Sequence, residues 1–448
     1  MSLADESSLL FIPTGYRESK IYSVFPTTGV GDFTFNRNSS ATRIAKNGLI
    51  TSVATDIPRL EYPLIDGVVN GCPSLLLEPQ RTNLFPYSSD YNQTDWDKFN
   101  ITIESNSTIS PDGTLNADKI LEQVGSANGH FMFDNLGLSI NTEYNFSVFV
   151  KKLNRRYVAI QNSYNTANGS IAFFDLDTET LVYTYSTGTV GTFIVSDAKI
   201  EKYPNGWYRL SANFQSDAAG GVLPSLVLAN SQWSTGFSYN NTYTGDVTKG
   251  IYFWGAQLEE GSYPTSYIPT NGTTVTRLVD TANGAGDATT FNDSEGVLMA
   301  EISALSETTD VRVLSISDGT TSNMVFIRFD TLNRIIAEVT VLNGGSVNPL
   351  FIAPDITSFN KIALKWALND VALWVNGIEV STISVIGQFA PNTLNVMNLS
   401  MPNLANTMDA KTKQIQYYDS ALTDSELEQL TSWTSFTDLA NGQQYSIK

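Results

Sequence analysis

Short runs of alternating apolar and polar residues, each closed by turn-forming residues, constrain the fold of this chain most strongly. In the stretch Gly250–Arg277, Ile251 and Phe253 alternate with neighbouring residues at a period of two, which is the period of a strand with two different faces. Gly261 and Pro264 then interrupt the run, and polar residues follow. We interpret the stretch as the last strand of one β-sandwich and the strap that leads to the next.

Runs of the same kind occur on both sides of this stretch. Residues 84–269 contain several short β-type runs bounded by Asn, Gly, Ser and Asp, as in a sandwich. Residues 270–433 contain a second set, in which Asn376-Gly377 indicates a tight hairpin. Thr423 and Glu426 have the spacing of a helix capping box. The sequence therefore predicts an all-β protein with two tandem jelly-roll sandwiches.

The two ends of the chain lack this pattern of short alternating runs. Residues 1–83 carry many Pro and Gly residues among apolar ones, so they are too interrupted for long elements and too apolar for a free linker. We expect this extended, irregular N-terminal segment to pack along its own neighbouring domain, copies of itself, or a larger assembly. Residues 434–448 are polar and are expected to form a C-terminal tail.

Composition excludes several classes of partner. The 448 residues are 42% hydrophobic, 16% charged and carry a formal net charge of −19. Nucleic acids and anionic lipids are bound through clustered Lys and Arg, so neither is expected as a partner. No run approaches the roughly 20 apolar residues of a membrane span, and no signal peptide is evident. The single cysteine excludes an intrachain disulfide.

Three motifs in the N-terminal segment carry a family resemblance. They are Arg37–Arg43 (RNSSATR), Pro58–Tyr62 (PRLEY) and Leu75–Leu84 (LLLEPQRTNL). Together they resemble a module of tailed-phage virion proteins, of the crAss-like phages and their relatives. The resemblance implies a structural protein of a virion, made in the host cytoplasm and exposed on the particle surface. It also implies that the N-terminal segment attaches to other virion proteins.

Two further stretches resemble known sandwich domains. The order of the NGWYRL and YFWGAQLEEGSYPTSYIPT runs is similar to phage carbohydrate-binding jelly rolls, and these runs lie in residues 84–269. The ending KQIQYYDSALTDSELEQLT resembles the last strand and closing helix of laminin-G or concanavalin-like lectin domains, in residues 270–433. These resemblances imply lectin-like glycan binding, although such a fold can also be purely structural.

Catalysis has little support in the sequence. His130 is the only histidine, and we expect it on the surface or in a loop; we expect Cys72 to be a structural thiol that is at least half buried. Acidic pairs such as Glu259-Glu260 and Asp95-Asp97 could serve a glycosidase, but 45 acidic residues make such pairs common by chance. We expect Glu259-Glu260 to be solvated carboxylates at a strand end. We therefore predict that the protein is not an enzyme.

Sugar binding requires an exposed aromatic face flanked by polar groups. Two tryptophans lie in polar loops with such neighbours, and the candidate glycan-binding residues are Trp233 with Asn230 and Gln232, and Trp96 with Gln93 and Asp95. We assign Trp207 and Trp254 to the core of the first sandwich or its edge. We expect Trp366 and Trp374 between the sheets of the second.

Calcium is the one cofactor for which the sequence offers ligands. Asp280, Asp287 and Asp318 lie in Gly-containing loops and could supply carboxylates. They lack the ordered spacing of a calcium loop, and no other cofactor is expected.

The sequence therefore favours a head or tail fibre that binds host-surface or mucus glycans without catalysis. An architectural capsid or tail decoration or connector protein is the main alternative, and a virion enzyme that degrades polysaccharide is a further one. We expect a homo-oligomer, with a trimer favoured, because several weak sites gain avidity and the apolar N-terminal segment needs burial.

Overall fold

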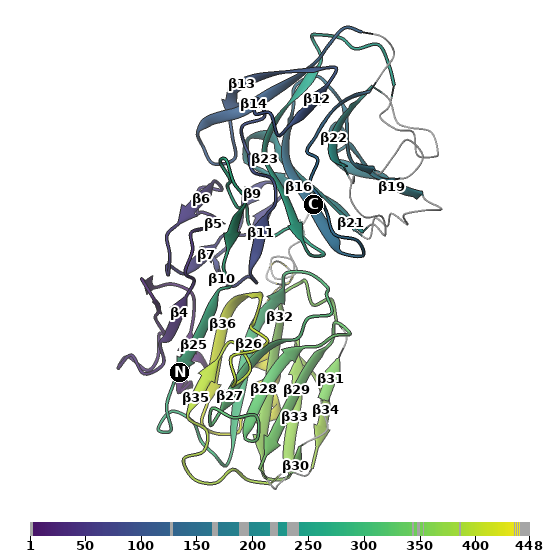
Figure 1. Ribbon diagram of the computed structural model, residues 1–448. Coiled ribbons are helices and arrows are strands. Elements are labelled where there is room, and N and C mark those ends of the chain that lie inside the picture. The colour runs from purple at the N-terminus through teal and green to yellow at the C-terminus, as the bar shows by residue number, and fades with distance from the viewer. Residues whose placement is uncertain are drawn as a thin grey trace.

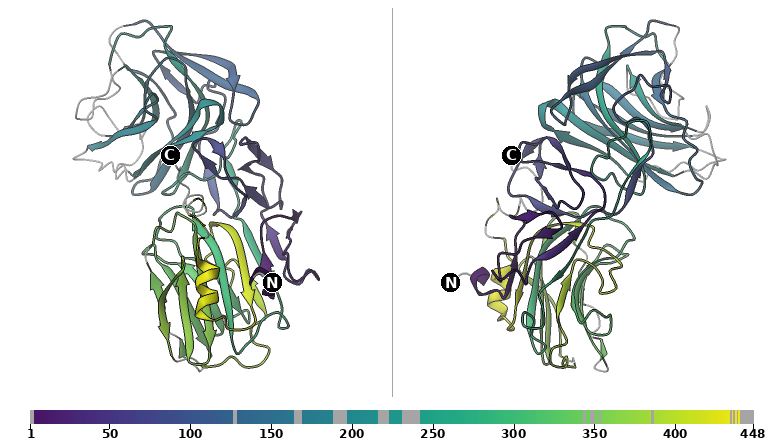
Figure 2. Two further views of the ribbon diagram at one scale, coloured as in Figure 1. Left: turned by 180° about the vertical axis from the view of Figure 1, so that it is seen from behind. Right: turned by 60° about the vertical axis from the view of Figure 1, so that its left-hand side comes forward.

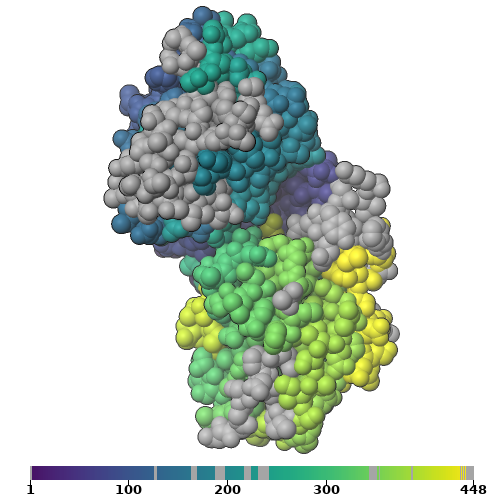
Figure 3. Space-filling model, turned by 90° about the vertical axis from the view of Figure 1, so that its right-hand side faces the viewer, coloured from purple at the N-terminus to yellow at the C-terminus, as the bar shows by residue number. Residues whose placement is uncertain are grey.

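The structure of the protein is a computed structural model. It describes the chain except residues 1–2, 126–128, 164–168, 188–196, 216–222, 231–241, 343–344, 347–349, 353, 385–386, 434, 436, 438 and 440–448. Two β-sandwiches lie one above the other, and the N-terminal segment runs along one side of their junction (Figure 1). The space-filling view shows a waist between the two bodies (Figure 3). The prediction of an all-β chain with tandem sandwiches is confirmed.

The first sandwich consists of two antiparallel sheets, each with six strands in the described part of the chain. One sheet has the order β12 (Asp97–Phe99), β15 (His130–Phe133), β22 (Leu223–Ala229), β17 (Tyr157–Ser163), β18 (Gly169–Asp175) and β19 (Thr180–Thr187). The other has the order β13 (Ile101–Ile109), β14 (Leu115–Glu122), β23 (Gly250–Glu260), β16 (Glu143–Lys152), β21 (Trp207–Gln215) and β20 (Ala198–Tyr203). A short 3₁₀ turn, η1 (Pro204–Gly206), joins β20 to β21.

Alternation along the strands explains the core of this sandwich. Phe146, Val148 and Val150 of β16 point between the sheets and meet Phe253 of β23, the last strand. The intervening Phe149 points to the other side of its sheet, where it packs on Trp254. The stretch that begins at Gly250 is therefore the closing strand of the first sandwich, as predicted.

The second sandwich has one sheet in which seven strands follow one another in the described residues. Their order is β34 (Ile378–Ile383), β33 (Asp370–Val375), β32 (Asn360–Ala367), β26 (Gly296–Ala304), β36 (Ala410–Tyr418), β10 (Ser74–Leu76) and β7 (Arg59–Glu61), with β1 (Leu9–Phe11) also paired to β36.

The facing sheet of the second sandwich also mixes early and late strands. Its order is β2 (Tyr16–Arg17), β3 (Lys20–Ile21), β4 (Phe33–Asn36), β25 (Thr281–Ala285), β35 (Val396–Asn398), β27 (Arg312–Ser317), β28 (Met324–Phe329), β29 (Ile335–Val341) and β30 (Gly345–Ser346), with β31 (Leu350–Ile352) also on β29.

The N-terminal segment packs along its own neighbouring domain, the first of the three alternatives that the sequence left open. β1 pairs with β36 in the register Leu9↔Tyr417, and β4 pairs with β25 in the register Phe35↔Ala282. Phe11 is fully buried in the core of the second sandwich. Residues 9–76 thus extend both sheets of the sandwich that was expected to begin at residue 270.

Three small two-stranded ladders lie outside the two sandwiches, and one short helix lies near the N-terminus. β5 (Ala41–Ile44) pairs with β6 (Ile50–Val53), β8 (Leu64–Ile65) with β9 (Val68–Val69), and β11 (Arg81–Asn83) with β24 (Val275–Arg277). The β11–β24 pair connects the entry to the first sandwich with the exit from it. A four-residue helix, α1 (Leu3–Glu6), precedes β1.

The closing helix α2 (Asp424–Thr431) forms as the capping-box pattern predicts. The Thr423 side chain accepts from the Glu426 backbone N–H, and the Glu426 side chain accepts from the Thr423 backbone N–H. The helix lies on the outer face of the second sandwich (Figure 2). There Leu427 is fully buried and packs in one cluster with Trp374 of β33 and Ala363 of β32. In the described part of the chain, neither helix has the length and apolar character needed to cross a bilayer.

The tryptophans divide between several cores. Trp254 and Trp207 are buried with Ile50 and Tyr267 on the outer face of their sheet, at the junction. Trp366 lies between the sheets of the second sandwich, as expected. The expectation for Trp374 is wrong, because this ring points to the opposite side of its sheet and lies beneath α2.

Candidate functional site

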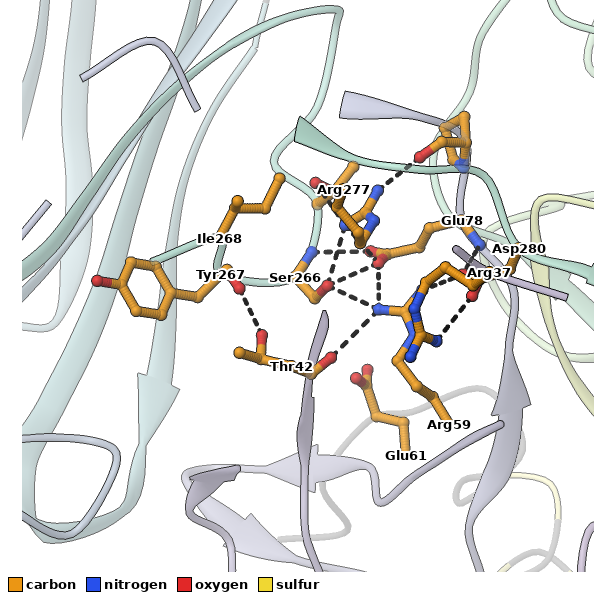
Figure 4. A network of polar contacts seen from close by, with 12 residues as sticks. Arg37, Thr42, Arg59, Glu61, Glu78, Ser266, Tyr267, Ile268, Arg277 and Asp280 are labelled. Carbon is orange, nitrogen blue, oxygen red and sulfur yellow. Dashed lines mark hydrogen bonds and ion pairs between the residues drawn. The ribbon is translucent and has the colours of Figure 1, made fainter. Parts of the chain in front are cut away.

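A buried network of charged residues holds the junction together (Figure 4). Arg37 follows β4, Arg59 opens β7, Glu78 follows β10, Arg277 ends β24, and Asp280 precedes β25. All five side chains are at most 4% exposed. The network therefore joins the N-terminal segment to the strap and to the start of the second sandwich.

Glu78 and Asp280 are the two acidic centres of this network. Glu78 Oε2 lies 2.5 Å from Arg59 Nη1 and 2.7 Å from Arg277 Nη1. Asp280 Oδ1 lies 3.0 Å from Arg37 Nη1, and Asp280 Oδ2 pairs with Arg59 and accepts from the Glu78 backbone N–H. Burial by itself would raise the pKa of Glu78, but the cations of Arg277 and Arg59 outweigh it and hold that pKa well below its usual value.

The strap contributes a second layer of hydrogen bonds. Ser266 donates to Glu78 through its backbone N–H, at 2.8 Å, and through its hydroxyl, at 2.6 Å. Glu259 is fully buried, accepts from the Thr265 backbone N–H at 2.9 Å, and also accepts from the Thr265 hydroxyl. The expectation of a solvated strand-end carboxylate is therefore wrong for Glu259, because the strap folds back over it; Glu260 is exposed, as expected.

A cleft of about 480 Å³ opens beside this network. The N-terminal segment, β20, β21, the strap and the start of β36 form its walls. Its volume falls within the range of about 300 to 1,000 Å³ that is usual for ligand pockets. The residues that give the cleft its chemical character are Thr42, Arg43, Glu61, Tyr62, Glu78, Lys199, Glu201, Lys202, Tyr203, Arg209, Tyr263, Thr265, Ser266, Tyr267 and Lys411.

Tyrosine rings form the apolar part of this junction cleft. Tyr62 and Tyr203 are half buried, and Tyr203 packs edge-to-face on Phe149 with ring centroids 4.9 Å apart. Tyr267 is buried, and its hydroxyl lies 2.6 Å from the Ser88 hydroxyl. Burial raises the pKa of both Tyr203 and Tyr267, so both phenols stay neutral at physiological pH. Neutral rings beside hydroxyl groups can bind the mixed apolar and polar faces of a sugar.

Ion pairs occupy most of the charged groups at the cleft. Lys411 Nζ lies 3.3 Å from Glu61 Oε1, and Lys202 Nζ lies 3.4 Å from Asp66 Oδ1. Burial would lower the pKa of Lys411, but Glu61 outweighs it and leaves this pKa raised, so Lys411 stays charged. Glu61 and Glu78 are thus both engaged with cations.

Arg209 differs from the other cleft residues, since it is 5% exposed and no carboxylate pairs with it among the described residues. Its Nη2 donates to the Ser147 hydroxyl at 2.9 Å and to the Thr265 carbonyl at 2.8 Å. Its Nε is buried without a hydrogen-bond partner, the guanidinium also bonds to Tyr203, and its carbon lies 5.4 Å from the centre of the Phe149 ring. Buried charges are usually paired with an opposite charge, so Arg209 is an exception among the described cleft residues.

The predicted glycan-binding residues lie elsewhere. Trp233 and Gln232 lie outside the described residues, and Asn230 is exposed directly after β22. Trp96 is 2% exposed and donates from Nε1 to the Tyr87 carbonyl at 2.9 Å. The expectation of an exposed Trp96 face is wrong, because the ring packs into the core of the first sandwich beside Phe85.

The neighbours of Trp96 reveal a carboxyl that the sequence did not single out. Asp95 is exposed, and Gln93 donates to Asp90 at 2.6 Å. Asp134 follows β15, is 6% exposed, and its Oδ2 is buried without a hydrogen-bond partner. Burial, reinforced by the charges of Asp95 and Asp97, raises the pKa of Asp134 to about 7.

The three candidate calcium ligands have other partners. Asp280 belongs to the buried network, Asp287 accepts from the backbone N–H groups of Thr289 and Thr290, and Asp318 accepts from Thr320 and Asn323. No group of three or more acidic, His or Cys side chains arranged to hold a metal ion occurs in the described ranges.

His130 and Cys72 have environments opposite to those expected. His130 is 1% exposed, in β15, and its ring stacks on Tyr243 with centroids 4.4 Å apart. Burial lowers its pKa. Cys72 is exposed. Polar flanks misled the interpretation of His130, because strand pairing decides its burial: His130 pairs with Leu228 inside its sheet. Cys72 lies between β9 and β10, outside both strands.

Comparisons with known proteins give only distant likenesses. No protein-family model matches this chain, and no curated protein sequence matches it. A carbohydrate-binding module, CBM40, of a Ruminococcus gnavus IT-sialidase is 21% identical over 33% of this chain and 88% of its own, with a TM-score of 0.29. With a sequence identity and a TM-score this low, the similarity says nothing about the function of this chain.

Two longer structural matches are equally distant. The LG4–5 domains of the mouse laminin α1 chain are 11% identical over 66% of this chain and 90% of their own, with a TM-score of 0.21. A Trypanosoma rangeli sialidase is 10% identical over 74% of this chain and 62% of its own, with a TM-score of 0.28. The assignment of two sandwiches therefore rests on the sheet topology described above.

Replacing Arg59 with Met should strongly destabilise the junction. The substitution leaves Glu78 and Asp280 buried with one cation fewer each, and the loss of one partner of a buried ion pair costs about 3–5 kcal/mol. Chemical denaturation should show this loss. The matched control is Lys152→Met, which removes the cation of a half-exposed surface pair with Asp177 and should cost less than about 1 kcal/mol. Equal effects of the two substitutions would contradict a stabilising network.

Replacing Asp134 with Asn should stabilise the first sandwich at high pH. Because the pKa is raised from an ordinary 3.8 to about 7 on folding, the protonated carboxyl is favoured in the folded state, and stability falls as pH rises from the lower value through the higher one. Asn stays neutral throughout, so the gain should be on the order of 4 kcal/mol at pH 8 and near zero at pH 4. Denaturation at both pH values measures it. Asp95→Asn, at an exposed position, removes a charge that raises the pKa of Asp134, so the pH-dependent loss of stability should move to lower pH. A difference in stability between the Asp134→Asn variant and wild type that does not change with pH would refute the raised pKa of Asp134.

Proposed function

We propose that this protein binds glycans without catalysis, as a head or tail fibre of a tailed-phage virion. The observation that carries the glycan part is the junction cleft, in which half-buried Tyr62 and Tyr203 lie with the hydroxyls of Thr42 and Ser266. A sugar ring has an apolar face that stacks on an aromatic ring and hydroxyls that bond to polar groups. The cleft offers both within a volume that accommodates a short saccharide.

A binding role is favoured over hydrolysis by the state of the cleft carboxylates. A glycosidase needs one carboxyl to give a proton and a second to act as base or nucleophile. Glu61 is paired with Lys411, and Glu78 is bound by Arg59 and Arg277. Neither of these two groups is free to exchange a proton with a substrate. Asp66 is paired with Lys202, so Glu201 is a single unpaired lining carboxylate among the described residues, where the reaction needs two. The predicted loop of Asn230, Gln232 and Trp233 stays part of the proposal as a second glycan contact.

The virion part of the proposal rests on the sequence motifs of the N-terminal segment. Three of their charged residues, Arg37, Arg59 and Glu78, lie in the buried network, so the motifs encode the joint between the segment and both sandwiches. This observation also supports the alternative of an architectural decoration or connector protein. In that case the sandwiches would serve protein contacts.

Glycan binding is tested on an array with the full chain. We expect selective binding, and Tyr62→Ala should weaken it about tenfold, because a stacked ring contributes on the order of 1 kcal/mol. Tyr22→Ala, at a residue that is 36% exposed and does not line the cleft, is the matched control. The absence of binding across a broad array would leave the architectural role, and released reducing ends from a bound polysaccharide would overturn the non-catalytic assignment.

The virion role carries a prediction of its own. We propose that the protein is a homo-oligomer, with a trimer favoured, that is exposed on the particle and contacts other virion proteins through its N-terminal segment. Sedimentation at micromolar concentration should give three times the monomer mass, and antibodies against the protein should label intact particles. A stable monomer would contradict the oligomer, and unlabelled particles would contradict the surface location.

A further inference from the structure

The junction gathers many of the cations of a chain with a formal net charge of −19. The buried network combines three arginines, Arg37, Arg59 and Arg277, with the acids Glu78 and Asp280. Buried Glu259 joins it through the Thr265 hydroxyl, which donates to Glu259 and accepts from Arg277, so the charges of the network balance. The positive charge that a ligand meets in the cleft must therefore come from other side chains.

Arg209 brings to the cleft a cation that no carboxylate pairs with in the described structure. Its Nη2 donates to a hydroxyl at 2.9 Å and to a carbonyl at 2.8 Å, its guanidinium also bonds to Tyr203, and its buried Nε has no acceptor. Glu201 is directly opposite Arg209 in the β20–β21 pair, but Glu201 is exposed and no ion pair between the two occurs in the described structure. The charge of Arg209 is therefore not neutralised by a direct ion pair.

Arg43 brings a second cation of this kind to the cleft, from β5. Its side chain is half buried, its guanidinium carbon lies 5.8 Å from the centre of the Tyr16 ring, and its Nε is buried without an acceptor. No carboxylate pairs with Arg43 among the residues that the structure describes. Two guanidinium groups thus line one cleft, and each has an Nε–H without a partner.

The remaining charges of the cleft offset these two only in part. Glu61, Asp66 and Glu78 are engaged with cations, and Lys199 pairs with Asp197 at 2.9 Å. Glu201 is the carboxylate without an ion pair among the described lining residues; it is exposed to water and lies on the same face of the sheet as Arg209, so one solvated carboxylate stands against two guanidinium groups. Planar guanidinium groups match the geometry of a carboxylate, and hydrogen bonds between charged groups are about twice as strong as neutral ones.

We propose that the junction cleft selects an acidic saccharide, whose sugar carboxylate is bound by Arg209 and Arg43 while a neighbouring ring contacts Tyr62 and Tyr203. This inference rests on the proposed glycan binding and specifies its ligand class. The partly buried surroundings of the two guanidinium groups strengthen the attraction, because they screen charge less than water does.

A matched pair of ligands tests the inference. The probes are a glucuronate-containing tetrasaccharide and the same tetrasaccharide with its carboxyls reduced to hydroxymethyl groups, titrated calorimetrically into the full chain. We expect at least tenfold tighter binding of the acidic form, and weaker binding as salt rises from about 50 to about 500 mM. Arg43→Met should lower the affinity for the acidic form about tenfold and leave the reduced form unaffected.

Two further variants complete the test. Arg209→Met should lower the affinity for the acidic form as Arg43→Met does. Because Arg209 is buried, a thermal melt is needed to show that this variant is still folded. If the Arg209→Met variant is unfolded, the variant at half-buried Arg43 still tests the inference. Lys46→Met removes an exposed charge of the same segment outside the cleft lining and should change nothing. Equal binding of both probes, or acidic binding insensitive to Arg43→Met, overturns the inference while the proposed function stands. Failure on every glycan of the array ends the proposed function itself.

Discussion

The buried pairing of Arg37, Arg59 and Arg277 with Glu78 and Asp280 is the interaction on which the rest of the structure depends. Ions out of contact with water are stable only when each finds its partner in good geometry. The partners here come from the N-terminal segment, the end of the strap and the start of the second sandwich. None of these parts can move away without leaving an unpaired charge in the interior, so the three parts are held together as one structural unit.

This constraint explains why the N-terminal segment behaves as part of the second sandwich. Its strands supply Leu9, Phe11 and Phe35 to that core, and β11 pairs with β24 where the chain enters and leaves the first sandwich. The strap, closed by the bonds of Glu259 to Thr265, then covers the outer face of β23. The junction cleft exists because these segments meet there, so its shape depends on the same contacts that hold the two sandwiches together.

Local sequence patterns predicted the elements well and the site poorly. Alternation located β16 and β23, and the Thr423–Glu426 spacing located α2, because strands and helix caps are determined by neighbouring residues. Trp96 and His130 were misjudged, since their polar flanks say nothing about which strands pair over them. The pairing of Asp280 with Arg37 was not predicted, because the two residues lie 243 positions apart in the chain. The motif residues Arg37, Arg59 and Glu78 were noticed only as signs of a resemblance.

By itself the sequence determined an all-β chain, two sandwiches and a strap between them, because period-two alternation and Pro/Gly punctuation act over a few residues. Only the tertiary structure decided that residues 9–76 extend the second sandwich and that five distant charges share one buried site. It also placed Arg43 and Arg209 at one cleft without a carboxylate partner among the described residues. Ion pairing and burial depend on which strands meet, and that is decided by contacts between residues far apart in the chain.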